Sequence, residues 1–121
     1  MTQKAKNKIL VLDDDPGILE AIKAILESEG YEVKAYERTD QIRISGEGRP
    51  DLIILDLLLS GKDGKEVARE LKQNDKTKSI PIIMFSAHPT AWESAKESGV
   101  DDFLPKPFDM NELLSMVKKY I

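Results

Sequence analysis

The sequence predicts one three-layer α/β/α domain, in which a parallel β-sheet lies between two layers of helices. Short apolar segments alternate with amphipathic segments five times along the chain. Most of these apolar segments are unbroken and only four to six residues long, which indicates strands buried on both faces. No repeat, linker or low-complexity stretch interrupts the 121 residues, a length typical of one domain.

Two strands and one well-defined helix are expected at the start of this domain. Residues 8–13, KILVLD, form the first strand, and Asp15 caps the helix after it, which has a proline at its first position. The apolar residues of 18–26 recur on one helical face, and Gly30 ends the helix. Residues 31–36, YEVKAY, alternate in polarity as a second strand.

A second helix is expected at residues 39–50, TDQIRISGEGRP, but it should be short or distorted. Ile42 and Ile44 lie two positions apart and two glycines follow them, which does not fit one helical face. The third strand is expected at residues 51–56, DLIILD, and residues 57–64 form the loop after it.

The second half of the chain continues the alternation. The expected elements are a helix at 65–74, a strand at 80–86, a short helix at 90–98 before Gly99, a strand at 101–106 and a last helix at 109–121. Pro105 cannot donate a ladder hydrogen bond, so its strand is expected at the sheet edge. Asp109 and Glu112 match a capping box. The apolar stripe of the last helix is expected to comprise Met110, Leu113, Leu114, Val117 and Ile121.

Composition limits the class of protein. The chain has no cysteine, which excludes disulfides and thiolate metal sites, and no apolar run near the roughly 20 residues of a membrane span. The start, MTQKAKNK, does not have the pattern of a signal peptide, so a cytoplasmic location is expected. Although this start is basic, the net charge is −4, and the acidic remainder argues against nucleic acid as a direct partner.

Five polar side chains follow four of the predicted strands. They are Asp13 and Asp14, Asp56, Ser86 and Lys106. Because ligands of open α/β sheets bind beyond the carboxyl ends of the strands, we expect these side chains to share one site. Two carboxylates about 4 Å apart repel by roughly 4 kcal/mol at an effective dielectric constant near 20, so the cluster must protonate or recruit a cation. Oxygen ligands favour Mg²⁺, which in turn shares its shell with phosphate oxygens.

Four segments together resemble the response-regulator receiver domains (CheY-like) of two-component signalling. They are ILVLDDDP, PDLIILDLLLSGKDG, IIMFSA and FLPKPF, in this order. The resemblance covers residues 8–121 as the receiver domain, preceded by a flexible basic tail at residues 1–7. It implies a (βα)5 flavodoxin-like fold with a five-stranded parallel sheet in the strand order 2-1-3-4-5.

The resemblance also implies a role for each strand-end residue. Asp56 would accept a phosphoryl group from a phosphohistidine of a sensor histidine kinase or histidine phosphotransfer protein. Asp14 would bind Mg²⁺ directly and Asp13 mainly through water, with Asp56 and the backbone carbonyl of Leu58 completing the protein's share. Lys106 would then balance charge on the transferring group.

Two further residues would couple the site to signalling. Ser86 would donate a hydrogen bond to a phosphoryl oxygen, and Phe103 matches an aromatic that turns inward on activation. The Lys106–Pro107 peptide bond matches one that is usually cis in this family.

The expected function is therefore a phosphorylation-controlled switch rather than an enzyme, catalysing only its own phosphorylation and dephosphorylation. It would signal through the face made by the helix at 90–98, the strand at 101–106 and the last helix. The expected partners of this face are a downstream protein target, an effector domain or a second copy of the chain in a homodimer. Neither nucleic acid nor membrane is expected as a direct partner. Because Leu58 offers no polar group to orient an attacking water, its aspartyl phosphate is expected to be long-lived.

Two other functions are weighed against this one. A phosphatase that turns over through a phospho-aspartate needs an acid two residues after its nucleophile, where this chain has Leu58. An FMN-binding flavodoxin-like protein needs a hydroxyl- and glycine-rich phosphate loop after the first strand. The segment DDDPG at that place would repel phosphate.

Overall fold

A computed structural model describes residues 7–38, 49–59, 62–88 and 90–121. It contains a five-stranded parallel sheet of β1 (Lys8–Leu12), β2 (Glu32–Tyr36), β3 (Leu52–Asp56), β6 (Ile82–Ser86) and β7 (Asp102–Pro105). The strands lie in the order β2-β1-β3-β6-β7. Since β6 and β7 are the fourth and fifth of the predicted strands, the predicted order 2-1-3-4-5 is confirmed.

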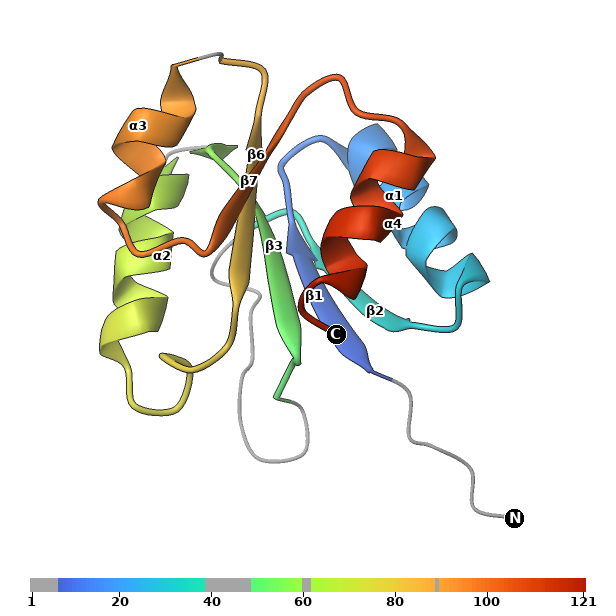
Figure 1. Ribbon diagram of the computed structural model, residues 1–121, viewed down its shortest axis with the longest axis horizontal. Helices are drawn as coiled ribbons and strands as arrows, with labels where there is room; N and C mark the ends of the chain where they lie inside the picture. Colours follow the sequence, from blue (N-terminus) through green and yellow to red (C-terminus); the bar gives the residue numbers. More distant parts are fainter. Residues whose placement is uncertain (1–6, 39–48, 60–61, 89) are drawn as a thin grey trace.

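Helices cover both faces of this sheet (Figure 1). The helices are α1 (Pro16–Ser28), α2 (Gly64–Gln73), α3 (Ala91–Lys96) and α4 (Met110–Lys118). Alternate residues of each central strand belong to two separate apolar clusters, one beneath α1 and α4 and the other beneath α2 and α3. In β3, for example, Ile54 lies in the first cluster and Ile53 in the second. The unbroken apolar strands of the sequence therefore fill two cores, one on each face.

The predicted helix ends have the expected chemistry. The Asp15 carboxylate accepts hydrogen bonds from the backbone N–H groups of Gly17 and Ile18 at the start of α1. Asp109 and Glu112 form the predicted capping box of α4. Gly30 has a φ of 92°, a backbone conformation that side-chain-bearing residues rarely adopt, and it follows the end of α1.

Two predictions about local structure were wrong. The expected loop at 57–64 contains a two-stranded antiparallel sheet of β4 (Leu58–Leu59) and β5 (Lys62–Asp63). Met110 is 51% exposed instead of belonging to the apolar stripe, because it is the first residue of α4 and the buried positions begin one turn later at Leu113.

Other predictions fall outside the described residues. Of the helix expected at 39–50, residues 39–48 are not described, and of the tail expected at 1–7, residues 1–6 are not described. Within the described ranges, none of the helices is long and apolar enough to cross a membrane.

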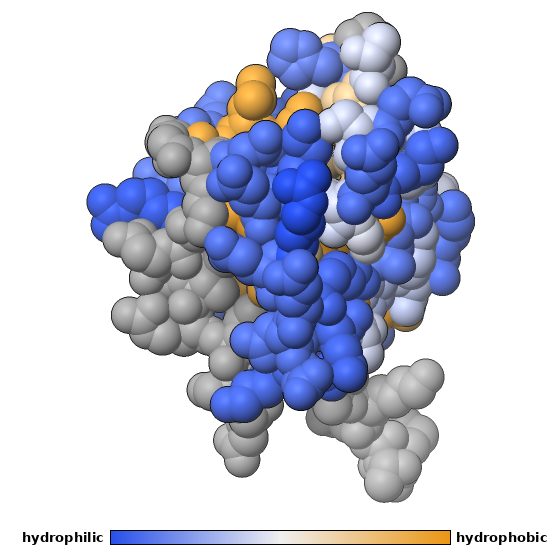
Figure 2. Space-filling model, turned by 90° about the vertical axis from the view of Figure 1, so that its left-hand side faces the viewer, coloured by the Kyte–Doolittle hydropathy of each residue, from blue (hydrophilic) through white to orange (hydrophobic). Residues whose placement is uncertain are grey.

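The outer surface of α2 and α3 is largely hydrophilic, as Figure 2 shows. Most of the hydrophobic surface in this view, coloured orange, lies toward the upper end of the molecule. The carboxyl ends of the parallel strands lie at this same end (Figures 1 and 2). Leu58, 59% exposed, is one of two large apolar side chains exposed among the described residues. It belongs to this end of the molecule, two residues after the end of β3.

Candidate functional site

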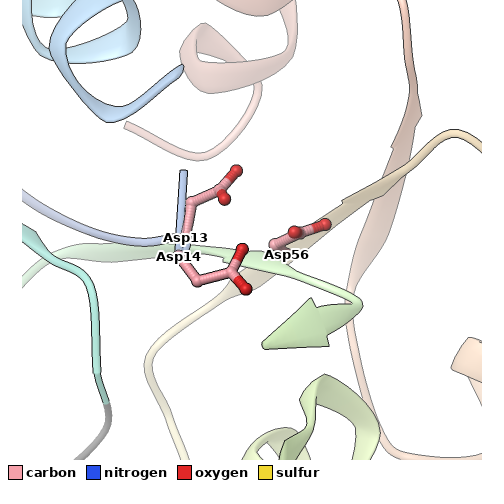
Figure 3. Close-up of side chains that lie close together, drawn as sticks. All are labelled: Asp13, Asp14 and Asp56. Carbon is pink, nitrogen blue, oxygen red and sulfur yellow. The ribbon is translucent and has the colours of Figure 1, made fainter. Parts of the chain in front are cut away.

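Three carboxylates meet at the carboxyl end of the sheet. Asp13 and Asp14 follow β1, and Asp56 is the last residue of β3 (Figure 3). One oxygen atom from each of the three lies within 4.8 Å of the others. Asp13 is 1% exposed and Asp56 is 7% exposed, whereas Asp14 lies at the surface.

Strand register places these groups together. Leu12 of β1 pairs with Leu55 of β3, so the residues that follow each of them lie side by side. Successive side chains of a strand point to opposite faces, which puts Asp13 and Asp56 on the same face. The turn after Asp56 requires Gly64, because a Cβ atom there would lie 2.2 Å from the backbone oxygen of Asp56.

Lys106 reaches the carboxylates from the other side of the site. It follows β7 at the edge of the sheet, where its backbone N–H donates to the carbonyl of Ser86. Its Nζ atom lies 3.5 Å from Asp13 Oδ2 and 3.5 Å from Asp56 Oδ1. The Lys106–Pro107 peptide bond is cis, as the family resemblance implied. Pro105 ends the edge strand, as predicted.

The electrostatics of the site show a shortage of positive charge. Burial raises the pKa of Asp56, and the charge of Asp13 raises it further, to about 6, despite the opposing effects of Lys106 and of a hydrogen bond from the Leu58 backbone. Burial likewise raises the pKa of Asp13, against a hydrogen bond from the Asp15 backbone and the charge of Lys106. One ammonium group therefore faces more negative charge than it can balance.

This donor set fits a hard divalent cation. All three side chains offer oxygen atoms, and burial raises the pKa values of two of them. An ion of charge +2 would favour their charged forms and offset their mutual repulsion. Oxygen ligands in this number are those that Mg²⁺ takes from proteins while it keeps several waters. The residues therefore fit the metal that the sequence predicts.

Ser86 and Phe103 lie at the margin of this cluster. Ser86 ends β6 and is buried, and its Oγ accepts a hydrogen bond from the backbone N–H of His88. The His88 side chain is exposed. Phe103 belongs to the cluster on the α2 and α3 side. Its ring lies against Trp92 of α3, with 5.8 Å between centroids. The structure thus places Phe103 away from the carboxylates and beneath α3.

One contact of the site was missed by the sequence reasoning. The Nζ atom of Lys106 lies 4.5 Å from the centroid of the Phe85 ring. Phe85 is fully buried and was interpreted only as part of an apolar strand. The signal in the sequence was the position of Phe85, directly before Ser86 at the end of a predicted strand. In the structure, this position pairs with Asp56 across β3 and β6.

In a doubly wound α/β domain, a carboxylate cluster and a lysine at the carboxyl ends of the parallel strands form the kind of site that supports phosphoryl transfer. Comparison with known proteins specifies the class. Residues 9–118 match the family of the response regulator receiver domain, and the chain belongs to this family. Domains of this family are phosphorylation-controlled signalling domains of two-component systems and not enzymes in the usual sense.

Individual relatives agree with this assignment. The DNA-binding dual master transcriptional regulator RpaA of Synechocystis is 37% identical over 116 residues, which are 92% of this chain and 47% of that protein. The chain thus spans about half the length of this curated relative.

Two solved structures are similar over nearly their whole length. A putative response regulator from Chloroflexus aurantiacus has a TM-score of 0.86 and 32% identity, covering 96% of this chain and 98% of that one. The receiver domain of the sensor histidine kinase PA1611 from Pseudomonas aeruginosa has a TM-score of 0.85 and 30% identity, with the same coverage. That structure has a magnesium ion coordinated in its active site cleft.

Proposed function

We propose that Asp56 is the residue that accepts the phosphoryl group. The observation that carries this proposal is the environment of its carboxylate, which is buried, has a raised pKa and lies 3.5 Å from the ammonium of Lys106. An oxygen of Asp56 would form a bond to phosphorus while the bond from phosphorus to the donor's imidazole nitrogen breaks. The product is an aspartyl phosphate.

Lys106 and Ser86 would assist the transfer by balancing and orienting charge. In a loose phosphoryl-transfer transition state, negative charge spreads over the equatorial oxygens, so a positioned ammonium stabilises it. Lys106 Nζ already lies 3.5 Å from oxygens of both Asp13 and Asp56, so it would be close to a phosphoryl group bound to Asp56. The Ser86 hydroxyl would rotate its proton toward a phosphoryl oxygen, since its present bond with His88 uses it as an acceptor.

The metal proposed for this chain is Mg²⁺. Asp13, Asp14 and Asp56, with the backbone carbonyl of Leu58, would hold it, Asp13 mainly through water. Bound there, it would supply positive charge next to the phosphoryl oxygens. The closeness of the three carboxylates supports this assignment.

The phosphodonor is proposed to be a sensor histidine kinase or a histidine phosphotransfer protein. Its docking surface would include an apolar pocket of about 460 Å³ that Lys106 shares with α1 and with the segment after β7. Ile18, Ile25 and Phe108 line this pocket. Leu58, two residues after Asp56, has an exposed side chain that would add apolar surface for the same partner.

Signalling is proposed to run through α3, β7 and α4. Phosphorylation would draw Ser86 toward the phosphoryl group and free space for Phe103 to turn inward, away from Trp92. The contact between these two rings supports a link between the site and α3. The altered face would bind a downstream protein target, an effector domain or a second copy of the chain. A cytoplasmic location is proposed with this role.

Intact mass spectrometry tests the acceptor assignment. Incubation with acetyl phosphate and Mg²⁺ should add one phosphoryl group to the wild type and none to Asp56→Ala. Asp75→Ala is the matched control, because the Asp75 side chain is 92% exposed, follows the end of α2 and does not belong to the carboxylate cluster. This variant should be phosphorylated normally. Addition of the group to Asp56→Ala at the wild-type rate would refute the proposal.

A fluorescence measurement tests the proposed switch. Trp92 is the single tryptophan of the chain. Its emission should change when acetyl phosphate is added to the wild type with Mg²⁺ and should not change in Asp56→Ala. If phosphorylation proceeds by mass while the emission stays constant, the inward movement of Phe103 is wrong.

A further inference from the structure

Four neighbouring strand ends place one row of side chains on the same face of the sheet. Across the sheet, the order is Asp13 after β1, Asp56 on β3, Phe85 on β6 and Lys106 after β7. Alternation along each strand puts them on the side of α1 and α4, where Val11, Ile54 and Leu104 lie two residues earlier. Phe85 is the apolar member of an otherwise charged row.

The lysine side chain has to cross Phe85 to reach the carboxylates. Lys106 starts at the edge of the sheet, and β6 lies between its strand and β3. Its Nζ atom ends 4.5 Å from the centroid of the Phe85 ring, within the roughly 6 Å over which a cation is attracted to an aromatic face. Phe85 therefore forms the floor beneath the ammonium group.

The carboxylates alone do not fix this ammonium group. Both of its contacts with them are 3.5 Å long, whereas a charge-assisted hydrogen bond is usually about 2.7–2.9 Å. The ring is itself held rigidly, because Phe85 is fully buried and packs edge-to-face against Phe108, with 6.0 Å between centroids and 87° between planes. A rigid ring can thus set the height of a flexible lysine above the sheet.

We propose that Phe85 is a positioning residue, whose ring face holds the Lys106 ammonium over the phosphoacceptor through a cation–π contact. This inference rests on the proposed function of Asp56 and adds to it a residue that touches neither metal nor phosphoryl group. The ring keeps the ammonium within reach of both carboxylates while leaving it free to turn to a phosphoryl oxygen. An aliphatic residue of similar size would fill the core without this attraction.

An NMR measurement tests the contact without any phosphorylation. In protein with ¹³C-labelled lysine, the ring current of Phe85 should move the ε-methylene protons of Lys106 upfield, and Lys106→Arg identifies this signal by removing it. Phe85→Leu should return the signal to the usual lysine region. Lys96, which lies 5.4 Å from the Trp92 ring, is the internal control and should keep its shift in Phe85→Leu. An unshifted Lys106 signal in the wild type would overturn the proposal.

A kinetic measurement tests the role. Site-specific replacement of Phe85 by mono-, di- and trifluorophenylalanine keeps the shape of the ring and weakens its negative face step by step. The rate of phosphorylation by acetyl phosphate should fall with each fluorine, by about threefold to tenfold in total. In Lys106→Ala, the residual rate should not respond to fluorination. A flat series in the wild type, or an equal slope in Lys106→Ala, would refute positioning by the ring.

The two measurements separate this inference from the proposed function. If acetyl phosphate labels Asp56 but the fluorinated series is flat, Asp56 remains the acceptor and the role of Phe85 is wrong. If the wild type is not labelled while the Lys106 signal is shifted and depends on Phe85, the contact is upheld and the acceptor assignment fails.

Discussion

Two groups of charges lie near opposite ends of β7, and they differ in how well their carboxylates are supplied with donors. At the start of the strand, the Asp102 carboxylate accepts hydrogen bonds from Lys119 Nζ at 2.8 Å, from the Tyr120 hydroxyl at 2.9 Å and from the Phe103 backbone at 2.9 Å. Burial alone would raise the pKa of Asp102, but these hydrogen bonds outweigh it and lower the pKa. This carboxylate is fully satisfied.

Beyond the other end of the strand, the balance is reversed. Asp13 and Asp56 share one ammonium at 3.5 Å, and the pKa of Asp56 rises to about 6. The same residue types therefore build a stabilising ion pair at one end and a site with excess negative charge at the other. What differs is the balance between burial and compensation: at Asp56 burial and the neighbouring charge of Asp13 outweigh the donors, whereas at Asp102 the donors outweigh burial. A buried carboxylate with too little compensating charge is the one that can gain from a cation.

The largest difference between the two ends should come from removing their lysines. Lys106→Ala should slow phosphorylation by acetyl phosphate on the order of 100-fold, because one positioned charge is lost from the transition state. Lys119→Ala is the matched control and should leave the rate unchanged while costing less than about 1 kcal/mol of stability, since its side chain is 62% exposed. Comparable rates for the two variants, measured by intact mass against time, would contradict the assignment of Lys106.

The next difference concerns the pH dependence of stability without metal. The pKa of folded Asp56, about 6, exceeds the ordinary 3.8, so the folded protein binds more protons than the unfolded chain between these values. Stability should therefore fall as the pH rises from 4 to 6, by up to about 3 kcal/mol from Asp56. The fall should be smaller in Asp56→Asn, where only the raised pKa of Asp13 still contributes to it. Urea unfolding in EDTA at several pH values measures it.

Asp102 should show the opposite sign in the same experiment. Its pKa is lowered in the folded state, so its contribution is present above the ordinary value of 3.8 and is lost as the pH falls through the folded pKa. Asp102→Asn should lack this loss at acid pH and keep the fall between pH 4 and 6. If Asp56→Asn and Asp102→Asn had the same dependence of stability on pH, the two carboxylates would not have opposite pKa shifts, and this prediction would be wrong.

A third prediction concerns the repulsion between the carboxylates at the carboxyl end of the sheet. Without metal, Asp13→Asn should raise the free energy of unfolding by about 1 kcal/mol, or roughly 3–6 °C in melting temperature, because Asp56 loses a buried neighbour of like charge. Millimolar Mg²⁺ should raise the melting temperature of the wild type and have little effect on this variant. A wild type that does not respond to Mg²⁺ would exclude Asp13 and Asp14 as its ligands.

The smallest predicted effect concerns the lifetime of the aspartyl phosphate. Leu58 lies two residues after Asp56 with an exposed, apolar side chain that cannot orient a water molecule. Leu58→Asn should speed the loss of the phosphoryl group about fivefold, the effect of roughly one hydrogen bond. Decay of the phosphorylated mass after removal of acetyl phosphate measures this. An unchanged decay rate would show that the side chain at this position does not limit hydrolysis.

Much of the fold followed from local patterns that the structure obeys. The cap at Asp15, the end of α1 before Gly30 and the edge position of the strand containing Pro105 each depend on one residue's own chemistry. The hairpin of β4 and β5 was missed because each of its strands has only two residues, too few for any periodic pattern. The exposure of Met110 was missed because the spacing of apolar residues does not show at which turn a helix begins to pack against the sheet.

The sequence by itself determined that Asp13, Asp14, Asp56 and Lys106 would gather at one edge, because parallel strands end on the same side of their sheet. Only the tertiary structure decided how the negative charges of these carboxylates are affected by Lys106 and by burial. The depth of burial that raises the pKa of Asp56, and the ring of Phe85 beneath Lys106, depend on which strand lies beside which. Desolvation and cation–π attraction act between residues distant in the chain, and their strength depends on distances that no local pattern contains.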